Sequence, residues 1–424
     1  MESSGQVSRL VNGSPVFYGW VIMAAGTLGL IMTSPGQTYA VSIFIEHFIN
    51  DLGISRSLVS TLYTAGTLVG SLALPLLGRL IDQRGPRLLA VVIAALFGLA
   101  CIYMGFVGNA IMLGIGFLAI RTFGQGGLGL VSQHVMNQWW VRRRGAIMGI
   151  SGLGLALLGV GGFPTLISHL ITIYGWRLTY PLLGGLVLMV MIPVAIVLFR
   201  NRPEHFGLLP DGGQPVAAGL LGQPPLPEVN WTPAEAMRTV AFWVVTLGVA
   251  AIAMLSTGLF FHMVSIFTDN NLSAAQAAYV YAPIAITTAL ANLASGVLMD
   301  RIPVRVLLAI ALLFQALSLW LAQSLDTITL AVIYGIVLGA TSGLMRTVSG
   351  VAWADYFGRL HLGSISGSAS TILIAGSALG PVPLGLARDA FGSYDVALQA
   401  LILLPLLLAA ASLFTGRPQK AVSD

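Results

Sequence analysis

The chain has 424 residues, of which 56% are hydrophobic and only 8% are charged. Soluble domains carry about 25% charged residues, so this composition excludes an ordinary soluble protein and indicates that most of the surface lies in lipid. The net charge of +5 does not indicate a nucleic-acid partner, because the basic residues form short clusters between apolar runs and not a basic face with stacking aromatics.

Twelve apolar runs, each reaching or approaching the length that spans a bilayer, follow the polar N-terminal segment that precedes Phe17. A segment in lipid must satisfy its own backbone N–H and C=O groups, so helix is the expected structure of each run. The first run is too long for the apolar core of a cleaved signal peptide and is interpreted as an uncleaved signal anchor. The expected helices are 17–43, 57–77, 88–107, 111–135, 146–172, 178–199, 241–267, 274–298, 304–323, 328–351, 363–386 and 394–414.

The arginines between these runs fall mainly on one side of the membrane, which predicts the orientation by the positive-inside rule. With the N-terminus in the cytoplasm, only Arg56, Arg177 and Arg388 lie in outside loops. We therefore expect an integral protein of the plasma (inner) membrane of a prokaryote, with both termini cytoplasmic.

A stretch of different composition divides the chain into two halves. Residues 201–233 contain seven prolines, several glycines and no apolar period, which is typical of a linker. The predicted organisation is an N-terminal six-helix bundle at residues 1–200, a cytoplasmic linker at 201–238 and a C-terminal six-helix bundle at 239–424.

The two halves repeat each other in register. Trp20-Val21 and Val41-Ser-Ile-Phe44 recur in the second half as Trp243-Val244 and Val264-Ser-Ile-Phe267, both displaced by the same interval. Gly78-Arg-Leu-Ile-Asp82 recurs as Gly296-Val-Leu-Met-Asp300, and Trp139-Trp140 recurs as Tyr356-Phe357, at nearly the same displacement. Two repeats related by an axis along the membrane normal are a transporter architecture, in which the substrate site lies near the midplane.

The segment Gly78-Arg-Leu-Ile-Asp82-Gln-Arg84-Gly85-Pro-Arg87 resembles the signature loop of the major facilitator superfamily, and Asp300-Arg301 is its weaker second copy. The resemblance implies an all-α membrane protein with twelve transmembrane helices in two six-helix pseudo-symmetric bundles. An acid at a helix end can cap a neighbouring helix and pair with a loop arginine. The predicted gating latch consists of Asp82, Arg84, Arg87, Asp300 and Arg301; the alternative is that the arginines serve only as an inside anchor.

Finer motifs resemble the oxalate/formate antiporter–monocarboxylate transporter branch of that family. They are Trp139-Trp140 before Arg142-Arg143-Arg144-Gly145, Gly175-Trp176-Arg177, Arg202-Pro203-Glu204, Arg238-Thr-Val-Ala-Phe-Trp243 and Tyr356-Phe357-Gly358-Arg359. The resemblance implies a secondary transporter of small carboxylate anions that works as a monomer, by exchange or with a proton. One departure is that the eighth and eleventh predicted helices hold no basic residue, although carboxylate porters of this branch usually carry an arginine in the eighth and some carry a lysine in the eleventh.

Charged side chains inside lipid-spanning helices are costly and are functional candidates. None of the 15 acidic residues lies in the middle of a predicted helix, which argues against a cationic substrate and against a proton relay of carboxylates. Arg346 lies about eleven residues, or ~16 Å, from the inner end of the tenth helix. We interpret Arg346 as the counter-charge for an anionic substrate; the alternative is an arginine bonded to the carbonyl groups of a kinked helix.

Further polar residues on the first, fourth and eighth predicted helices are candidates for the site. Residues at i+4 spacing share one face of a helix, and such a stripe runs from Arg121 through Gln125 to Gln133. Arg121 belongs to a motif that resembles the family's helix 4 arginine motif. We expect its end at Gln133 and His134 to face the cavity, whereas its upper half can equally be structural packing. The other candidates to bond a carboxylate or hydroxyl, each of which alone is more often a packing residue, are Gln37, Tyr39, Tyr281, Thr288 and Asn292.

His262 is the candidate carrier of a coupled proton, because histidine changes charge near physiological pH and no buried acid is available. A structural histidine is the alternative. The glycine-rich segment at residues 149–154 follows no strand, so we interpret its glycines as helix-packing residues and not as a nucleotide loop. No metal-ligand spacing or nucleophile motif indicates a metal, a cofactor or an enzyme activity.

The sequence therefore predicts a secondary active transporter that moves a small organic anion by alternating access, coupled to protons. The anion is expected to be a monocarboxylate such as lactate, or a dicarboxylate. Two alternatives stay open, namely an exporter or exchanger of a neutral or amphiphilic small molecule and a membrane sensor that does not transport. The expected partners are the anion, protons and membrane lipid.

Overall fold

The computed structural model describes residues 9–212 and 229–420, and within these ranges every regular element is a helix. The first half contains α1 (Arg9–Asn12), α2 (Gly19–Met32), α3 (Thr38–Leu52), α4 (Arg56–Ser71), α5 (Leu74–Arg84), α6 (Pro86–Met104), α7 (Ala110–Ile120), α8 (Gly129–Trp139), α9 (Arg144–Gly154) and α10 (Phe163–Val197). The second half contains α11 (Pro233–Met237), α12 (Val240–Asp269), α13 (Ala274–Met299), α14 (Val304–Leu321), α15 (Ile328–Phe357), α16 (Leu362–Leu379), α17 (Pro381–Phe391) and α18 (Asp395–Phe414).

Eleven stretches of the described chain are long and apolar enough to cross a membrane. Ten of them have 18 to 34 residues, but Arg144–Val197 has 54, or about 81 Å at 1.5 Å per residue, more than twice the ~30 Å bilayer core. This stretch breaks at Gly175, whose φ of 73° and ψ of 164° are not helical, so it crosses twice. The predicted all-α fold with twelve transmembrane helices is confirmed.

The described residues form two compact units. One unit contains residues 9–147, 154–212, 229–232 and 357–370, and the other contains 148–153, 233–356 and 371–420. Part of α9 therefore belongs to the second unit, and the first turns of α16 belong to the first. The predicted boundaries at residues 200 and 238 divide the chain by sequence order, whereas the two units group residues by their contacts. These boundaries therefore stay a prediction.

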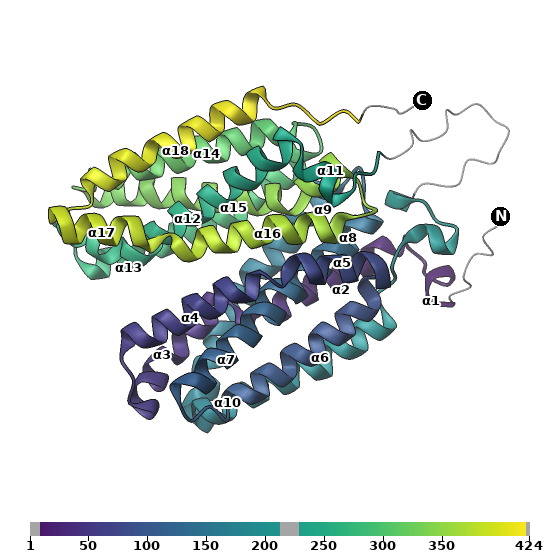
Figure 1. The fold of residues 1–424 in the computed structure, drawn as a ribbon, viewed down its shortest axis with the longest axis horizontal. Helices are drawn as coiled ribbons and strands as arrows, with labels where there is room; N and C mark the ends of the chain where they lie inside the picture. Colours follow the sequence, from purple (N-terminus) through teal and green to yellow (C-terminus); the bar gives the residue numbers. More distant parts are fainter. Residues whose placement is uncertain (1–8, 213–228, 421–424) are drawn as a thin grey trace. The chain divides into compact units, whose positions relative to one another are not determined.

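In the first unit, α10 runs alongside α6, α4 alongside α7, and α2 alongside α8 (Figure 1). Small residues let membrane helices approach closely, and a Cβ atom on Gly184 of α10 would lie 2.5 Å from the carbonyl oxygen of Gly98 of α6. At the end of α8, the buried indoles of Trp139 and Trp140 donate to the carbonyl oxygens of Arg200 and Gly19 at 2.9 and 3.1 Å. These two bonds tie α8 to the start of α2 and to the chain that leaves α10.

In the second unit, α12 packs against α14, α17 and α18, and α14 also runs alongside α18 (Figure 1). The apolar core here includes Leu259, Phe267 and Leu319, all fully buried. Within this core the Ser256 hydroxyl donates to Oε1 of Gln315 at 2.8 Å. Such a bond between helices satisfies polar groups that lipid cannot satisfy.

Two spans of the first unit are interrupted where polar side chains gather. The short 3-10 helix η1 (Ser34–Gly36) contains Pro35 and separates α2 from α3, so that Gln37 is extended with φ −85° and ψ 154°. The π-helix η2 (Arg121–Leu128) separates α7 from α8. Interruptions of this kind occur often at functional sites, because they leave backbone groups free to bond side chains or ligands.

Candidate functional site

Asp82 lies in the last turn of α5, and its carboxylate caps the N-terminus of α16. The backbone N–H groups of Gly363 and Ser364 donate to it at 2.7 Å each, and the Ser364 hydroxyl also donates at 2.7 Å. A carboxylate here satisfies N–H groups that have no partner within the helix and interacts favourably with the helix dipole. The contact joins residues from opposite sequence repeats, as the latch hypothesis requires; its role in gating stays a prediction.

Glycines explain how α5 comes close enough to α16. Gly78 precedes Asp82 by one helical turn and lies on the same face, and a Cβ atom on Gly78 would lie 1.9 Å from the carbonyl oxygen of Gly363. In the reverse direction, a Cβ atom on Gly363 would lie 2.4 Å from the carbonyl oxygen of Gly78. The spacing Gly-x-x-x-Asp therefore has a physical reason: glycine permits the close approach, and aspartate one turn later caps the neighbouring helix.

The other predicted latch residues lie at or next to the ends of α5, α6 and α13. Arg87 donates through Nε and Nη2 to the carbonyl oxygen of Ile196, near the end of α10, at 3.1 and 2.6 Å. Arg84 and Arg301 are exposed, and Asp300 is the C-cap residue of α13. The structure therefore brings Asp82 to α16 and Arg87 to α10, and the grouping of the five residues into one latch stays a prediction.

His134 lies beside Asp82. It is buried, with Nδ1 4.0 Å from Oδ1 of Asp82 and Nε2 3.1 Å from the amide nitrogen of Gln138. Gln138 donates to the carbonyl oxygen of Arg359 at 2.8 Å, and the Arg359 guanidinium pairs with Glu204 at 2.7 Å. The structure thus places His134 in the network around the cap of α16.

We expect Asp82→Asn to weaken the cap, because an amide offers one acceptor oxygen and no negative charge to three donors. The loss of a helix cap costs about 0.5–2 kcal/mol, so the melting temperature should fall by a few degrees. The transport rate in proteoliposomes should fall as well. The matched control is Asp326→Asn in an exposed loop. A melting temperature and rate equal to those of the parent protein would contradict the latch.

Arg121 opens the π-helix η2 and is buried. Its Nε donates to the Thr67 hydroxyl at 2.9 Å, and its Nη1 donates to the carbonyl oxygen of Gly36 at 3.0 Å. Its guanidinium carbon lies 4.7 Å from the centre of the Tyr63 ring, a distance typical of a cation–π contact. The arginine therefore holds α4, η1 and η2 together.

Two predicted ligands flank the same break in the first span. Gln37 follows η1 and donates from Nε2 to the Thr33 hydroxyl at 3.0 Å, and the Tyr39 hydroxyl lies 2.9 Å from the Ser34 hydroxyl. Both side chains are partly exposed. The structure therefore groups Gln37 and Tyr39 with Arg121 on one unit, whereas Gln133, also partly exposed, lies in α8 beyond η2.

The predicted polar ligands of α13 make helix-packing contacts. Asn292 is buried and accepts at Oδ1 from the Thr347 hydroxyl of α15 at 3.2 Å, and a Cβ atom on Gly152 of α9 would lie 2.1 Å from its Nδ2. The Thr288 hydroxyl donates to the carbonyl oxygen of Ile284 within α13 at 2.7 Å. Tyr281 is exposed, and its ring stacks on Phe260 with 6.1 Å between centres. Of these three residues, only Tyr281 is exposed on its unit.

Arg346 lies in the middle third of α15. It lies eleven positions before Phe357 at the end of the helix, which corresponds to ~16 Å. Its side chain is exposed on its unit, whereas the neighbouring Thr347 and Val348 are buried. The helix therefore packs through other faces and leaves this guanidinium at the surface of the unit.

His262 of α12 is hydrogen-bonded through both ring nitrogens. Nε2 lies 3.0 Å from the carbonyl oxygen of Pro381, which can only accept, so Nε2 carries a proton. Nδ1 lies 3.1 Å from the Tyr394 hydroxyl, which in turn lies 3.0 Å from the Ser265 hydroxyl. The Tyr394 hydroxyl donates to Ser265 and has a single proton, so its oxygen is placed to accept from Nδ1 when that nitrogen carries a proton. If Nδ1 carries no proton, Tyr394 can donate to it only by giving up its bond to Ser265.

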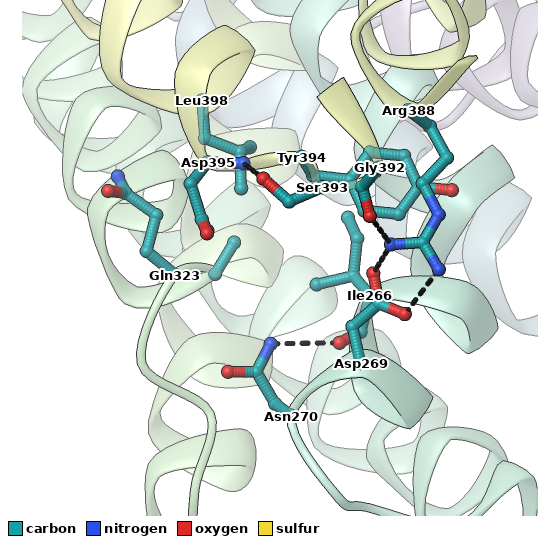
Figure 2. A pocket seen from close by; sticks show the side chains of 11 residues that line it. Ile266, Asp269, Asn270, Gln323, Arg388, Gly392, Ser393, Tyr394, Asp395 and Leu398 are labelled. Carbon is teal, nitrogen blue, oxygen red and sulfur yellow. Dashed lines mark hydrogen bonds and ion pairs between the residues drawn. The ribbon is translucent and has the colours of Figure 1, made fainter. Parts of the chain in front are cut away.

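Tyr394 also lines a cavity of about 310 Å³ where α12 ends and α18 begins. Figure 2 shows Arg388 reaching across to both carboxylate oxygens of Asp269, while Asn270, Gln323 and Asp395 line other parts of the wall. The guanidinium carbon of Arg388 lies 5.4 Å from the centre of the Tyr394 ring. A polar cavity thus leads to the tyrosine that bonds His262.

The sequence interpretation did not select Arg121, Tyr394, Arg388 or Asp269 as site residues. Arg121 had a usable signal, since it is a charged residue inside an apolar run. Asp269 and Arg388 also had one, because they are opposite charges at the predicted outer ends of the seventh and eleventh helices. Tyr394 had no such signal, because its contact with His262 joins residues far apart in the chain.

Comparison with known proteins agrees with this architecture. The sequence model of the Major Facilitator Superfamily matches residues 26–287 and 245–424. The oxalate:formate antiporter of Oxalobacter formigenes is 25% identical over 53% of this chain and 50% of its own length, so the match spans about half of that relative. Monocarboxylate transporter 13 of Rattus norvegicus is 24% identical over 96% of this chain and 94% of its own length.

A solved structure shows the same fold. The human organic anion transporter MFSD10 (TETRAN) superposes with a TM-score of 0.68 at 14% sequence identity, covering 93% of this chain and 99% of that one. Together with the twelve membrane crossings and the family match over most of the sequence, this shows that the chain is an integral membrane transporter that belongs to the Major Facilitator Superfamily.

Proposed function

We propose that the chain is a secondary active transporter of a small organic anion, a monocarboxylate or a dicarboxylate, that works by alternating access and couples anion movement to protons. The observation that carries this proposal is the distribution of charge in the spans. Arg121 and Arg346 each lie eleven residues inside a span of 30 residues, counted from Ala110 and from Phe357. Among the described residues the acid farthest inside a span is Glu46, six residues from Leu52.

Charge in the middle of a membrane helix costs several kilocalories per mole on insertion scales, so it is retained where it has a function. A guanidinium matches the planar fork of a carboxylate and remains charged at all relevant pH values. The names of the relatives, an oxalate:formate antiporter and a monocarboxylate transporter, support the same substrate class. Arg346 is the proposed counter-charge of the substrate.

The test is a comparison of binding and flux. Thermal stabilisation of the purified protein by sodium oxalate, formate and lactate measures binding, because a ligand that binds only the native state raises its stability. Uptake and counterflow in proteoliposomes measure transport. Stabilisation by one carboxylate with matching uptake supports the proposal. No stabilisation and no flux with any of the three anions would overturn it, and stabilisation without flux would support a sensor.

His262 is the proposed proton carrier. The groups that face it are the Tyr394 and Ser265 hydroxyls and the carbonyl oxygen of Pro381, with the Arg388–Asp269 pair behind Tyr394 and Asp395 next to it in the chain. Protonation adds a positive charge that compensates an incoming anion. Low pH should therefore favour uptake of the anion.

We expect His262→Gln to remove this pH dependence. Uptake by the parent protein should be faster at pH 5.5 than at pH 7.5, and uptake by the variant should change little between these pH values. His169→Gln is the control, since His169 is exposed in α10. A pH profile of His262→Gln that matches the parent profile would exclude His262 as the proton carrier.

One observation favours a second candidate function, the exchange or export of a neutral amphiphile. Among the described residues, neither α13 nor α16 contains a basic residue, although these helices correspond to the eighth and eleventh spans where the branch usually carries its arginine or lysine. Competition decides between the two: an amphiphile that stabilises the protein, with no effect of carboxylates on its binding, would favour this second function.

A further inference from the structure

Arg121 is bonded only to neutral groups. The side chain is 6% exposed, and its described acceptors are the Thr67 hydroxyl, the Gly36 carbonyl oxygen and, at 3.5 Å, the Thr38 hydroxyl. No described carboxylate forms an ion pair with it. A buried cation without a counter-ion is costly, and none of the described carboxylates offsets the charge of Arg121, which makes an anionic ligand a suitable partner.

The guanidinium also has unused donors. Arginine carries five N–H groups in a flat fork, and the described contacts of Arg121 use Nε and Nη1. The two N–H groups of Nη2 donate to no described protein acceptor, and Nη2 is not among the fully enclosed atoms that lack a partner. Nη2 is therefore not fully enclosed, and its N–H groups are available to a ligand.

Two hydroxyl groups, those of Thr38 and Tyr63, lie close to the Arg121 guanidinium. The Tyr63 hydroxyl donates to the Thr38 hydroxyl at 2.8 Å, Thr38 is exposed and Tyr63 is partly exposed. Both lie at the break of the first span, where Gln37 is extended and η1 directs the carbonyl oxygen of Gly36 at the arginine. The carbonyl and Thr67 fix the orientation of the guanidinium, and its Nη1 lies 3.5 Å from the Thr38 hydroxyl.

We propose that Arg121, with Thr38 and Tyr63, forms an anion subsite on the first unit that binds the carboxylate of the transported anion. The inference rests on the proposed function and adds a binding residue on the first unit. In the subsite the carboxylate accepts from the Nη2 edge of Arg121, and the hydroxyls of Thr38 and Tyr63 supply further donors. The Tyr63 ring and the Gly36 carbonyl hold the guanidinium in place before the anion arrives.

The test uses the full chain in detergent and sodium oxalate, formate and lactate as probes, with sodium chloride as the control for ionic strength. Arg121→Gln should raise the dissociation constant for the stabilising carboxylate at least tenfold. Arg121→Lys should raise it less, because lysine keeps the charge but loses the fork. Arg177→Gln is the matched control, because Arg177 is a half-exposed arginine that pairs with Asp51.

Folding is separated from binding by a second pair of variants. If Arg121→Gln does not fold, Arg121→Lys and Thr38→Val decide, since both leave a positive charge near Thr67 and Gly36. An increase in the dissociation constant of several-fold in these variants supports the subsite. Unchanged dissociation constants in every folded variant would overturn it. If Arg346→Ala loses carboxylate binding while Arg121→Gln keeps it, the subsite is contradicted but the proposed function is not. If no carboxylate stabilises the parent protein, both the subsite and the proposed function are contradicted.

Discussion

Arg346→Ala should reduce carboxylate uptake at least tenfold without unfolding the protein. A hydrogen-bonded pair of a guanidinium and a carboxylate contributes about 1.5–3 kcal/mol, which corresponds to roughly a 10- to 150-fold change in affinity. Folding should survive, because the Arg346 side chain is exposed on its unit and the packing of α15 against α13 uses other residues, including Gly343 and Thr347. Uptake in proteoliposomes and thermal stabilisation by the same carboxylate measure the two effects.

Two further variants give this prediction its controls. Arg346→Lys keeps the charge and loses the planar fork, so it should retain part of the uptake. Arg142→Ala removes an arginine from the exposed loop before α9 and should leave both uptake and stabilisation unchanged. Normal uptake by Arg346→Ala would show that this arginine is not the counter-charge of the substrate, and the carboxylate assignment would then depend on Arg121 alone.

The fold was largely predictable because the signals that define it are local. The long apolar runs predict the crossings, and their order predicts the family architecture. The interruptions were less predictable. Pro35 indicated a kink, but the short 3-10 helix and the extended Gln37 that follow it depend on tertiary packing. The π-helix at Arg121–Leu128 contains three glycines, and glycine in an apolar run is equally compatible with regular helix packing.

The candidate site was predictable in its residue types and less so in its partners. Asp82 could be named from its motif, but Gly363 lies 281 residues away, and no local pattern connects the two. Asn292 appeared as a polar group on the eighth predicted helix, whereas the structure buries it against α15 and Gly152. Arg121 was placed in a glycine-packed stripe, and only the approach of the Gly36 carbonyl and Thr67 shows which of its donors are occupied.

Gly78→Ala should abolish transport, although it adds a single methyl group. The new Cβ atom would lie 1.9 Å from the carbonyl oxygen of Gly363 and 2.4 Å from its carbonyl carbon. Both are backbone atoms, so no side chain can move aside, and α5 must separate from α16. Asp82 follows one turn later on the same face, so this separation also breaks the three bonds of 2.7 Å that cap α16.

Comparison with another glycine isolates this effect from the general influence of alanine on a helix. Gly185→Ala in α10 adds a methyl group that has no neighbouring atom within 4 Å. Alanine also favours helix over glycine by about 0.8–1.0 kcal/mol. This variant should therefore be at least as stable as the parent protein and fully active. Gly78→Ala should instead combine a lower melting temperature with loss of uptake, and Gly363→Ala should behave in the same way because its Cβ atom meets the carbonyl oxygen of Gly78 at 2.4 Å. Full activity of both Gly78→Ala and Gly363→Ala would mean that transport does not need the close contact between α5 and α16, and the gating role of Asp82 would have to be abandoned with it.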